Sequence, residues 1–172
     1  MTITDMLMYF VPAFLVMVAM FLVQKKFLDR DISIRVTEAK HQKYKDTLPL
    51  RLQAYERLCI FLERISPPSL LPRVLNHAMS AQRFRSELIT TINSEFEHNV
   101  SQQIYITSDA WKSVRAAKEE TIHLIHTAFD SIHPDATAIQ LSAKIYEHIS
   151  KSGNFPSENA LIILRSEAAK LI

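Results

Sequence analysis

The first hydrophobic segment of the chain is long and carries no charge. Residues 6–24 contain no Asp, Glu, Lys or Arg, and residues 6–23 consist mainly of Leu, Phe, Val, Met and Ala. A helix over residues 6–23 is about 27 Å long, close to a hydrocarbon core of about 30 Å. The pattern predicts an N-terminal transmembrane helix within residues 1–24. The alternative is a helix buried in a protein core, which a segment apolar on all sides rarely becomes in so short a chain.

The residues that flank this segment predict its orientation. No Lys or Arg precedes it and no small-x-small cleavage site follows it, so we expect a retained anchor rather than a cleaved signal peptide. Basic residues gather on its C-terminal side, whereas only the acidic Asp5 lies on the other side. The positive-inside rule therefore predicts a single-pass protein of the bacterial inner membrane, with its N-terminus outside and its C-terminal domain in the cytoplasm.

A basic juxtamembrane stalk or linker is predicted over residues 25–47. The net charge of residues 25–45 is +4, and the basic residues are Lys25, Lys26, Arg30, Arg35, Lys40, Lys43 and Lys45. Beside a bilayer, such a segment is attracted to anionic headgroups; the alternative is that these charges only set the topology. Ile32, Ile34 and Val36 alternate as in a strand, while no breaker precedes Pro49, so the pattern leaves both a strand and a continued helix open.

From residue 48 onward, apolar residues recur at the spacing of amphipathic helices. The predicted helices cover residues 50–65, 80–100, 108–132, 136–152 and 157–172, with a short apolar piece over 70–77. The apolar stripes of the first two include Leu58, Leu62 and Ile65, and Phe84, Leu88, Ile92, Phe96 and Val100. We expect Thr47, Ser108 and Ser157 to act as N-caps, and Gly153 to occupy a left-handed C′ position. Because the connections are short, residues 48–172 are predicted to form a small antiparallel helical bundle. Residues 160–164 are apolar on all sides, which favours either a central buried position or a partner surface.

Composition narrows the class of protein. The single Gly excludes glycine-rich loops that cradle dinucleotides or phosphates. The single Cys excludes an internal disulfide framework, and the net charge of +2 argues against a nucleic-acid partner. The fold class is therefore predicted to be all-α, with an N-terminal transmembrane helix followed by a small cytoplasmic bundle, and no cofactor is expected.

Two Glu-x-x-His steps are the sharpest candidates for chemistry. Glu95 and His98 lie one helical turn apart, as do Glu120 and His123. Di-iron bundles use two such steps together with one Glu from each of two further helices. The apolar neighbours Ile122 and Ile125 compete with the second step for the core face. A metal site on these four residues is therefore the alternative, and solvated or interhelical polar clusters are the preferred interpretation.

Five stretches of the chain carry a resemblance to known sequences: residues 48–58, 62–67, 95–106, 110–111 and 118–120. They resemble a family of short, uncharacterised single-span proteins of Bacteroidota. Members of this family are known only as a domain of unknown function. The resemblance therefore implies a membrane-anchored helical protein and assigns no catalytic residue.

The resemblance also directs attention to a polar stretch at the end of one predicted helix. This stretch offers a possible polar network or binding edge, formed by Glu97, His98, Asn99, Gln102 and Gln103. We expect it to bridge helices, because helix ends need partners for their free carbonyl groups.

These patterns predict a non-enzymatic interaction or scaffold module at the inner membrane. The expected partners are the lipid bilayer and either another protein or a second copy of the chain. A metal-binding helical-bundle enzyme or sensor that uses the Glu-x-x-His steps is the alternative function.

Overall fold

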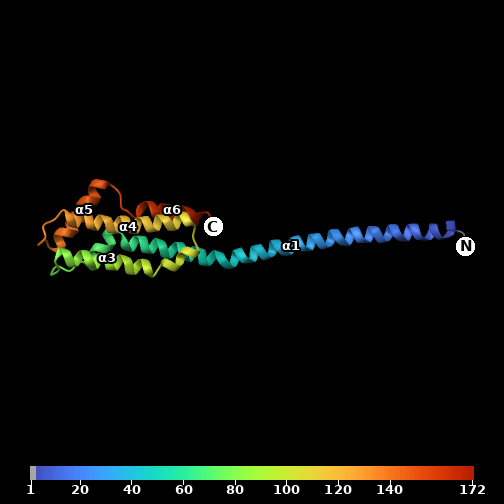
Figure 1. Cartoon of the computed structure of the whole chain (residues 1–172), viewed down its shortest axis with the longest axis horizontal. Helices are drawn as coiled ribbons and strands as arrows, with labels where there is room; N and C mark the ends of the chain where they lie inside the picture. Colours follow the sequence, from blue (N-terminus) through green and yellow to red (C-terminus); the bar gives the residue numbers. More distant parts are fainter. Residues whose placement is uncertain (1–2) are drawn as a thin grey trace. The chain divides into compact units, whose positions relative to one another are not determined.

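The computed structural model describes the backbone of residues 3–172 and the side chains of residues 14–28, 30, 35, 38 and 41–172. Within residues 3–172 the chain is all-α and contains no strand; Ser80 and Thr137 form an isolated bridge. The chain divides into two compact units, Met1–Thr47 and Leu48–Ile172. The helices are α1 (Ile3–Ile65), α2 (Pro67–Val74), α3 (Ala81–Glu97), the 3-10 helix η1 (Val100–Ile104), α4 (Ser108–Asp130), α5 (Ala138–Ser152) and α6 (Glu158–Ala169) (Figure 1).

The N-terminal unit is helical along its described backbone. Residues 31–47 are part of α1, which answers the choice between strand and helix in favour of the helix. The expected N-cap at Thr47 is wrong, because the helix continues through it and its hydroxyl donates to the carbonyl of Lys43, 2.8 Å away. Pro49 lacks an N–H and so removes one i→i−4 hydrogen bond, but a single lost bond does not end this helix.

The predicted transmembrane helix is not supported by the structure. Among the residues whose side chains are described, no helix has an apolar stretch long enough to span a bilayer. The side chains of residues 6–13, which form the first part of the predicted span, lie outside the described residues. The large apolar side chains of residues 14–18 are all exposed, with exposed fractions of 37% to 65%.

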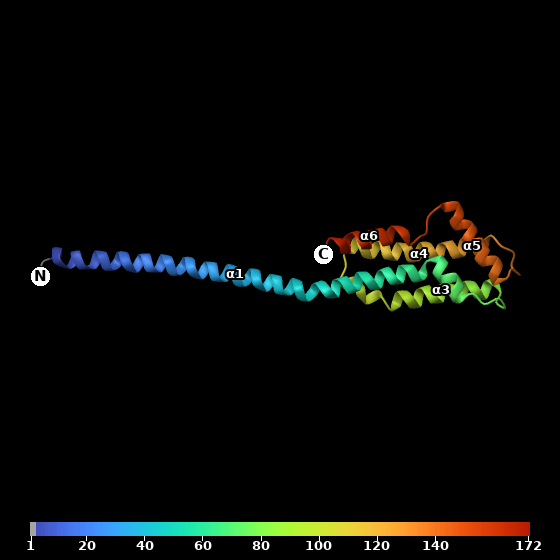
Figure 2. The same ribbon diagram turned by 180° about the vertical axis from the view of Figure 1, so that it is seen from behind.

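The C-terminal unit is a helical bundle. The C-terminal part of α1 lies alongside α3, α4 and α6. These four segments alternate in direction, as both ribbon views show (Figures 1 and 2). In this bundle α4 packs against α3, α5 and α6, and α5 also packs against α3. The connections between the helices are short, which favours this antiparallel arrangement.

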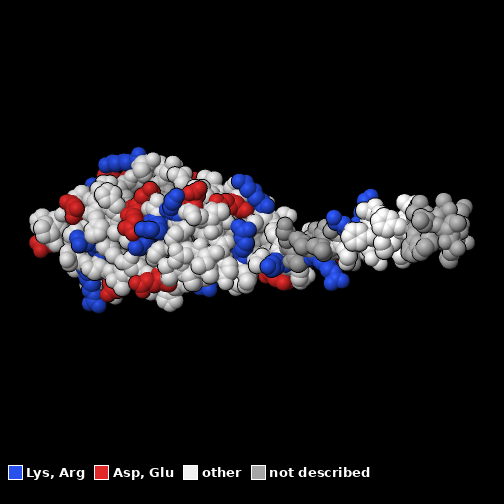
Figure 3. Space-filling model, turned by 45° about the vertical axis from the view of Figure 1, so that its right-hand side comes forward, with Lys and Arg blue, Asp and Glu red and all other residues white. Residues whose placement is uncertain are grey.

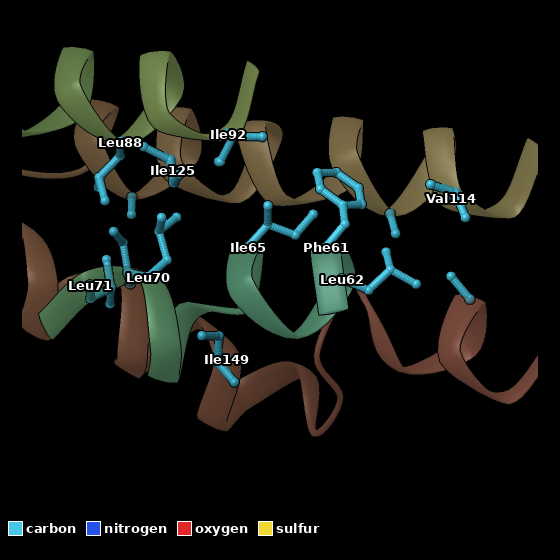
Figure 4. Close-up of a cluster of buried hydrophobic side chains, with 14 of the residues drawn as sticks. Phe61, Leu62, Ile65, Leu70, Leu71, Leu88, Ile92, Val114, Ile125 and Ile149 are labelled. Atoms are coloured by element: carbon cyan, nitrogen blue, oxygen red, sulfur yellow. The ribbon is translucent and has the colours of Figure 1, made fainter. Parts of the chain in front are cut away.

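The core of the bundle draws on six helices. Ile65 of α1 points toward Ile92 of α3, whereas Leu62 of α1 lies on the side of Val114 of α4 (Figure 4). Residues of α2, α5 and α6 complete the cluster. The predicted stripe on residues 80–100 is confirmed at Phe84, Leu88 and Ile92, which are fully buried. Its last member, Val100, is exposed because α3 ends at Glu97.

The helix ends differ from the predicted ones by a few residues. Thr107, not Ser108, caps α4, and its hydroxyl accepts from the N–H of Ala110. Thr137 and Gln140 form a capping box at the start of α5. Ser157 precedes α6 but makes no capping hydrogen bond with its side chain. The stop predicted after Ile65 is confirmed, and Pro67 begins α2 there.

The apolar segment at residues 160–164 is buried on one side only. Ala160, Leu161 and Leu164 face the core, whereas Ile162 and Ile163 are exposed. The expected burial therefore holds for Ala160, Leu161 and Leu164 but not for Ile162 and Ile163.

Gly153 confirms its predicted role and supports a stability prediction. Its φ of 77° is left-handed, and its N–H donates to the carbonyl of Ile149. An added Cβ meets no atom within 4 Å, so only backbone strain opposes a side chain there. We expect Gly153→Ala to lower the free energy of unfolding by about 1 kcal/mol. Denaturant unfolding measures this, with Ser150→Ala on the exposed face of α5 as the control; equal midpoints for the two variants contradict it.

Candidate functional site

The two Glu-x-x-His steps lie in different places. Glu95 pairs with Arg64, with Nη2 and Oε1 2.7 Å apart, and lies 3.5 Å from Arg73. The ring Nδ1 of His98 is 2.7 Å from the carbonyl oxygen of Ser94. Glu120 and His123 instead line a hollow beside α5. No group of three or more His, Cys, Asp or Glu residues that could hold a metal ion occurs in the described part of the chain.

Glu95 and His98 border a basic depression between α1 and α3. This depression of about 450 Å³ is also lined by Arg57, Ile60 and Arg64. Arg57 Nη2 donates to the carbonyl of His98, 3.2 Å away, so this guanidinium closes the carboxyl end of α3. The Glu95 carboxylate is therefore paired with the cations Arg64 and Arg73 rather than left free for a metal.

A polar network was expected among five residues of the stretch 97–103. The side-chain hydrogen bonds found there join residues close in sequence. The Asn99 amide donates to the carbonyl of Glu95 at 2.8 Å, and the Gln102 amide donates to the hydroxyl of Ser101 at 3.2 Å. Asn99 and Gln102 are buried, whereas Glu97, His98 and Gln103 are exposed. Within residues 41–172 no hydrogen bond joins one of these five side chains to another. The stretch thus completes the carboxyl end of α3 and the following 3-10 turn.

The basic residues of the stalk belong to the N-terminal unit. Those whose side chains are described are all exposed: Lys25, Lys26, Arg30, Arg35, Lys43 and Lys45. The side chain of Lys40 lies outside the described residues. Basic side chains are visible along the described part of this unit (Figure 3). Their exposure leaves them accessible to an anionic surface.

A hollow of the bundle lies between α4, α5 and the connection to α6. It has a volume of about 590 Å³ and is lined by Glu119, Glu120, His123, Leu124, Thr127, His148, Ser152, Asn154, Phe155, Pro156 and Asn159. The Nε2 atom of His148 is buried and has no hydrogen-bond partner. Phe155 is 38% exposed and presents an aromatic ring at the hollow. This hollow combines two carboxylates, two imidazoles and apolar side chains.

Sequence reasoning found only part of this hollow. It singled out Glu120 and His123 but missed His148 and the residues of the α5–α6 connection. No local signal marks them, because α4 and α5 bring them together only through their packing.

A second polar cluster ties α6 to the rest of the bundle. The Tyr55 hydroxyl donates to Glu167 Oε2 at 2.7 Å, and the Thr107 hydroxyl lies 2.7 Å from Oε1 of the same carboxylate. Burial raises the pKa of Tyr55, and the hydrogen bond to Glu167 raises it further. Because Thr107 is also the N-cap of α4, this cluster joins α1, α4 and α6. These hydrogen bonds connect helices, which indicates a structural role for the cluster.

Cys59 carries a free thiol and lies on α1, four residues after Tyr55. The residue is half-buried and packs against the hydrophobic cluster. Burial raises the pKa of the thiol, and Glu63 adds to the shift against the opposing effect of Arg165. A raised pKa lowers the thiolate fraction at neutral pH, which makes the thiol a poor nucleophile.

These features define a small all-α helical-bundle protein with a separate N-terminal helical unit. The chain belongs to a family of unknown function (DUF7935), whose model matches residues 1–171. The expected membership in a family of unknown function is thereby confirmed over nearly the whole chain. No curated protein and no solved structure matches the chain.

Proposed function

We propose that this chain is a single-pass anchor joined to a non-enzymatic interaction module, located at the bacterial inner membrane. Residues 6–23 insert into the bilayer, and the bundle of residues 48–172 binds a protein partner or a second copy of the chain. The N-terminus lies outside and the bundle in the cytoplasm.

The exposed apolar surface of the N-terminal unit carries this proposal. Phe14, Leu15 and Val16 are each more than 60% exposed, and Met17 and Val18 follow them directly. Consecutive residues of a helix point in different directions, so apolar side chains surround the helix here. A coiled coil needs an apolar seam on one side only. Lipid chains, in contrast, cover a helix on all sides, and the exposed cations that follow suit anionic headgroups.

A charge substitution within this helix tests the anchor. A triple variant, Leu15→Lys, Val18→Lys and Leu22→Lys, should lose membrane association, because each lysine near a bilayer centre costs about 3 kcal/mol. Membrane sedimentation followed by carbonate extraction measures this. The control places three lysines on the exposed surface of the bundle, at Gln53, Gln82 and Gln103, and should stay with the membrane. Native protein that is freely dissolved after cell breakage, without detergent, would refute the anchor.

The orientation is tested by labelling thiols from outside the cell. Cys59 is a poor reporter because it is half-buried and its thiol has a raised pKa, so it is first replaced by serine. Thiols are then introduced separately by Thr2→Cys and by Ser150→Cys. We expect labelling of the first in intact cells and of the second only after permeabilisation; the opposite pattern would reverse the orientation.

The interaction part of the proposal rests on the exposed face of α6. Ile162 and Ile163 are exposed on the side of α6 that the hydrophobic core of the bundle does not cover. Cross-linking in native membranes, followed by purification in mild detergent, should recover a partner or a dimer. Recovery of the monomer alone would argue against an interaction module.

A further inference from the structure

We propose that the hollow between α4, α5 and the α5–α6 connection binds a small organic ammonium ion, a protonated amine attached to an apolar body. The hollow is lined by residues of the C-terminal unit alone. This inference is therefore independent of the membrane anchor.

The charge of the hollow favours a cation. The Glu120 carboxylate forms no ion pair with any described residue, whereas its neighbour Glu119 is 3.1 Å from Lys118 Nζ. No Lys or Arg is among the residues that line the hollow. An unneutralised carboxylate in a partly enclosed site attracts a positive charge more strongly than the same group in open water.

The ring of His148 lines the same hollow and carries an unused hydrogen-bonding atom, Nε2, which is buried and lacks a partner. A neutral imidazole offers a lone pair on one ring nitrogen. A rotation of the ring would turn Nε2 toward the hollow. An ammonium N–H bound there, with Glu120 as its counter-charge, would supply the missing donor, and a buried polar group left without a partner is costly.

The rest of the lining suits an organic body rather than a bare metal ion. Leu124, Phe155 and Pro156 provide apolar surface, and a cation can also lie over the ring of Phe155. The volume of about 590 Å³ falls within the range of about 300–1,000 Å³ that is typical of small-molecule sites. Asn154 and Asn159 add neutral polar groups at the rim. A ligand with one positive end and one apolar end matches this lining.

Calorimetric titration of the full-length chain in detergent micelles tests the proposal with two probes of similar size. We expect saturable binding of 2-phenylethylammonium and an affinity at least about tenfold lower for 3-phenylpropionate, whose charge is reversed. Glu120→Gln removes the carboxylate and should weaken binding of the ammonium probe by about tenfold. Phe155→Ala should also weaken it, through loss of the aromatic surface.

Glu56→Gln is the matched control, since it makes the same change at an exposed carboxylate of α1 outside the hollow. It should bind the ammonium probe as the native chain does, which corrects for partitioning into micelles. Absence of saturable binding would overturn the proposal. Equal affinity for the two probes, or equal affinity in the native chain and Glu120→Gln, would overturn it as well.

Discussion

Replacing Leu62 by alanine should lower the free energy of unfolding of the bundle by about 2–5 kcal/mol. Leu62 is fully buried at the end of α1, where the core cluster draws on α1, α3 and α4 (Figure 4). The loss combines the transfer free energy of the deleted methyl groups with the cost of the cavity that remains. This variant removes atoms from the centre of the cluster, so the surrounding helices have little room to relax.

The fluorescence of Trp111 measures this loss. Trp111 is the single tryptophan of the chain, and it stacks on Phe96 at a ring-centroid distance of 5.4 Å, so its emission reports on the bundle. Urea unfolding of the full-length chain in mild detergent gives the free energy for each variant. Ile60→Ala is the matched control, because the isoleucine lies two residues away but is 50% exposed. A similar loss for both variants would place the core elsewhere than on this face of α1.

The contrast between these two positions shows what periodicity can predict. The stripe that contains Leu58, Leu62 and Ile65 was expected to face a core, and it does. Spacing of three and four residues suffices here because it depends only on the helix repeat. The left-handed residue at Gly153 was predictable for a similar reason, since the backbone there favours glycine whatever packs around it.

The ends of the helices were harder to predict than their buried faces. The start of a helix at Thr47 was a reasonable expectation for a Thr followed by Pro49, but α1 extends through both residues. The cap at Ser108 was displaced by one residue because the neighbouring Thr107 has the same capping chemistry. Local sequence does not choose between adjacent caps of equal quality.

The candidate sites were harder to predict than the helices. Glu95 has the spacing of a metal ligand, but Arg64 and Arg73 reach it from α1 and α2. His148 gives no signal on its own, and it becomes notable only because α5 places it in the same hollow as Glu120 and His123. Which side chains meet across helices depends on packing, so a motif on one helix predicts a site only when its partners are known.

Loss of the carboxylate at Glu167 is expected to destabilise the bundle by about 1–3 kcal/mol, because Glu167→Ala leaves the buried Tyr55 hydroxyl without an acceptor for its proton. Tyr55 is 2% exposed, and its hydroxyl donates to this carboxylate. Arg165→Ala, on the same helix, is the control: its ion pair with Glu63 is exposed and should contribute less than about 1 kcal/mol. Urea unfolding of both variants measures the difference. Equal losses of unfolding free energy would contradict a structural role for the Tyr55–Glu167 hydrogen bond.

The same hydrogen bond predicts how stability changes at alkaline pH. Burial and Glu167 raise the pKa of Tyr55 in the folded chain above its ordinary value of 10.0. The folded state therefore holds the phenol proton more tightly than the unfolded state does. The resulting stabilisation is fully present below pH 10.0 and is lost as the pH rises from there through the raised folded pKa.

Tyr55→Phe removes this titration together with the hydrogen bond. The variant should be less stable than the native chain at neutral pH, and its stability should decline less steeply above about pH 10. Unfolding free energies measured between about pH 8 and pH 11 test this, and the four remaining tyrosines serve as an internal background common to both proteins. Parallel declines in the two proteins would mean that Tyr55 gives up its proton equally easily in both states. The bond to Glu167 would then not be the contact that holds α6 against α1.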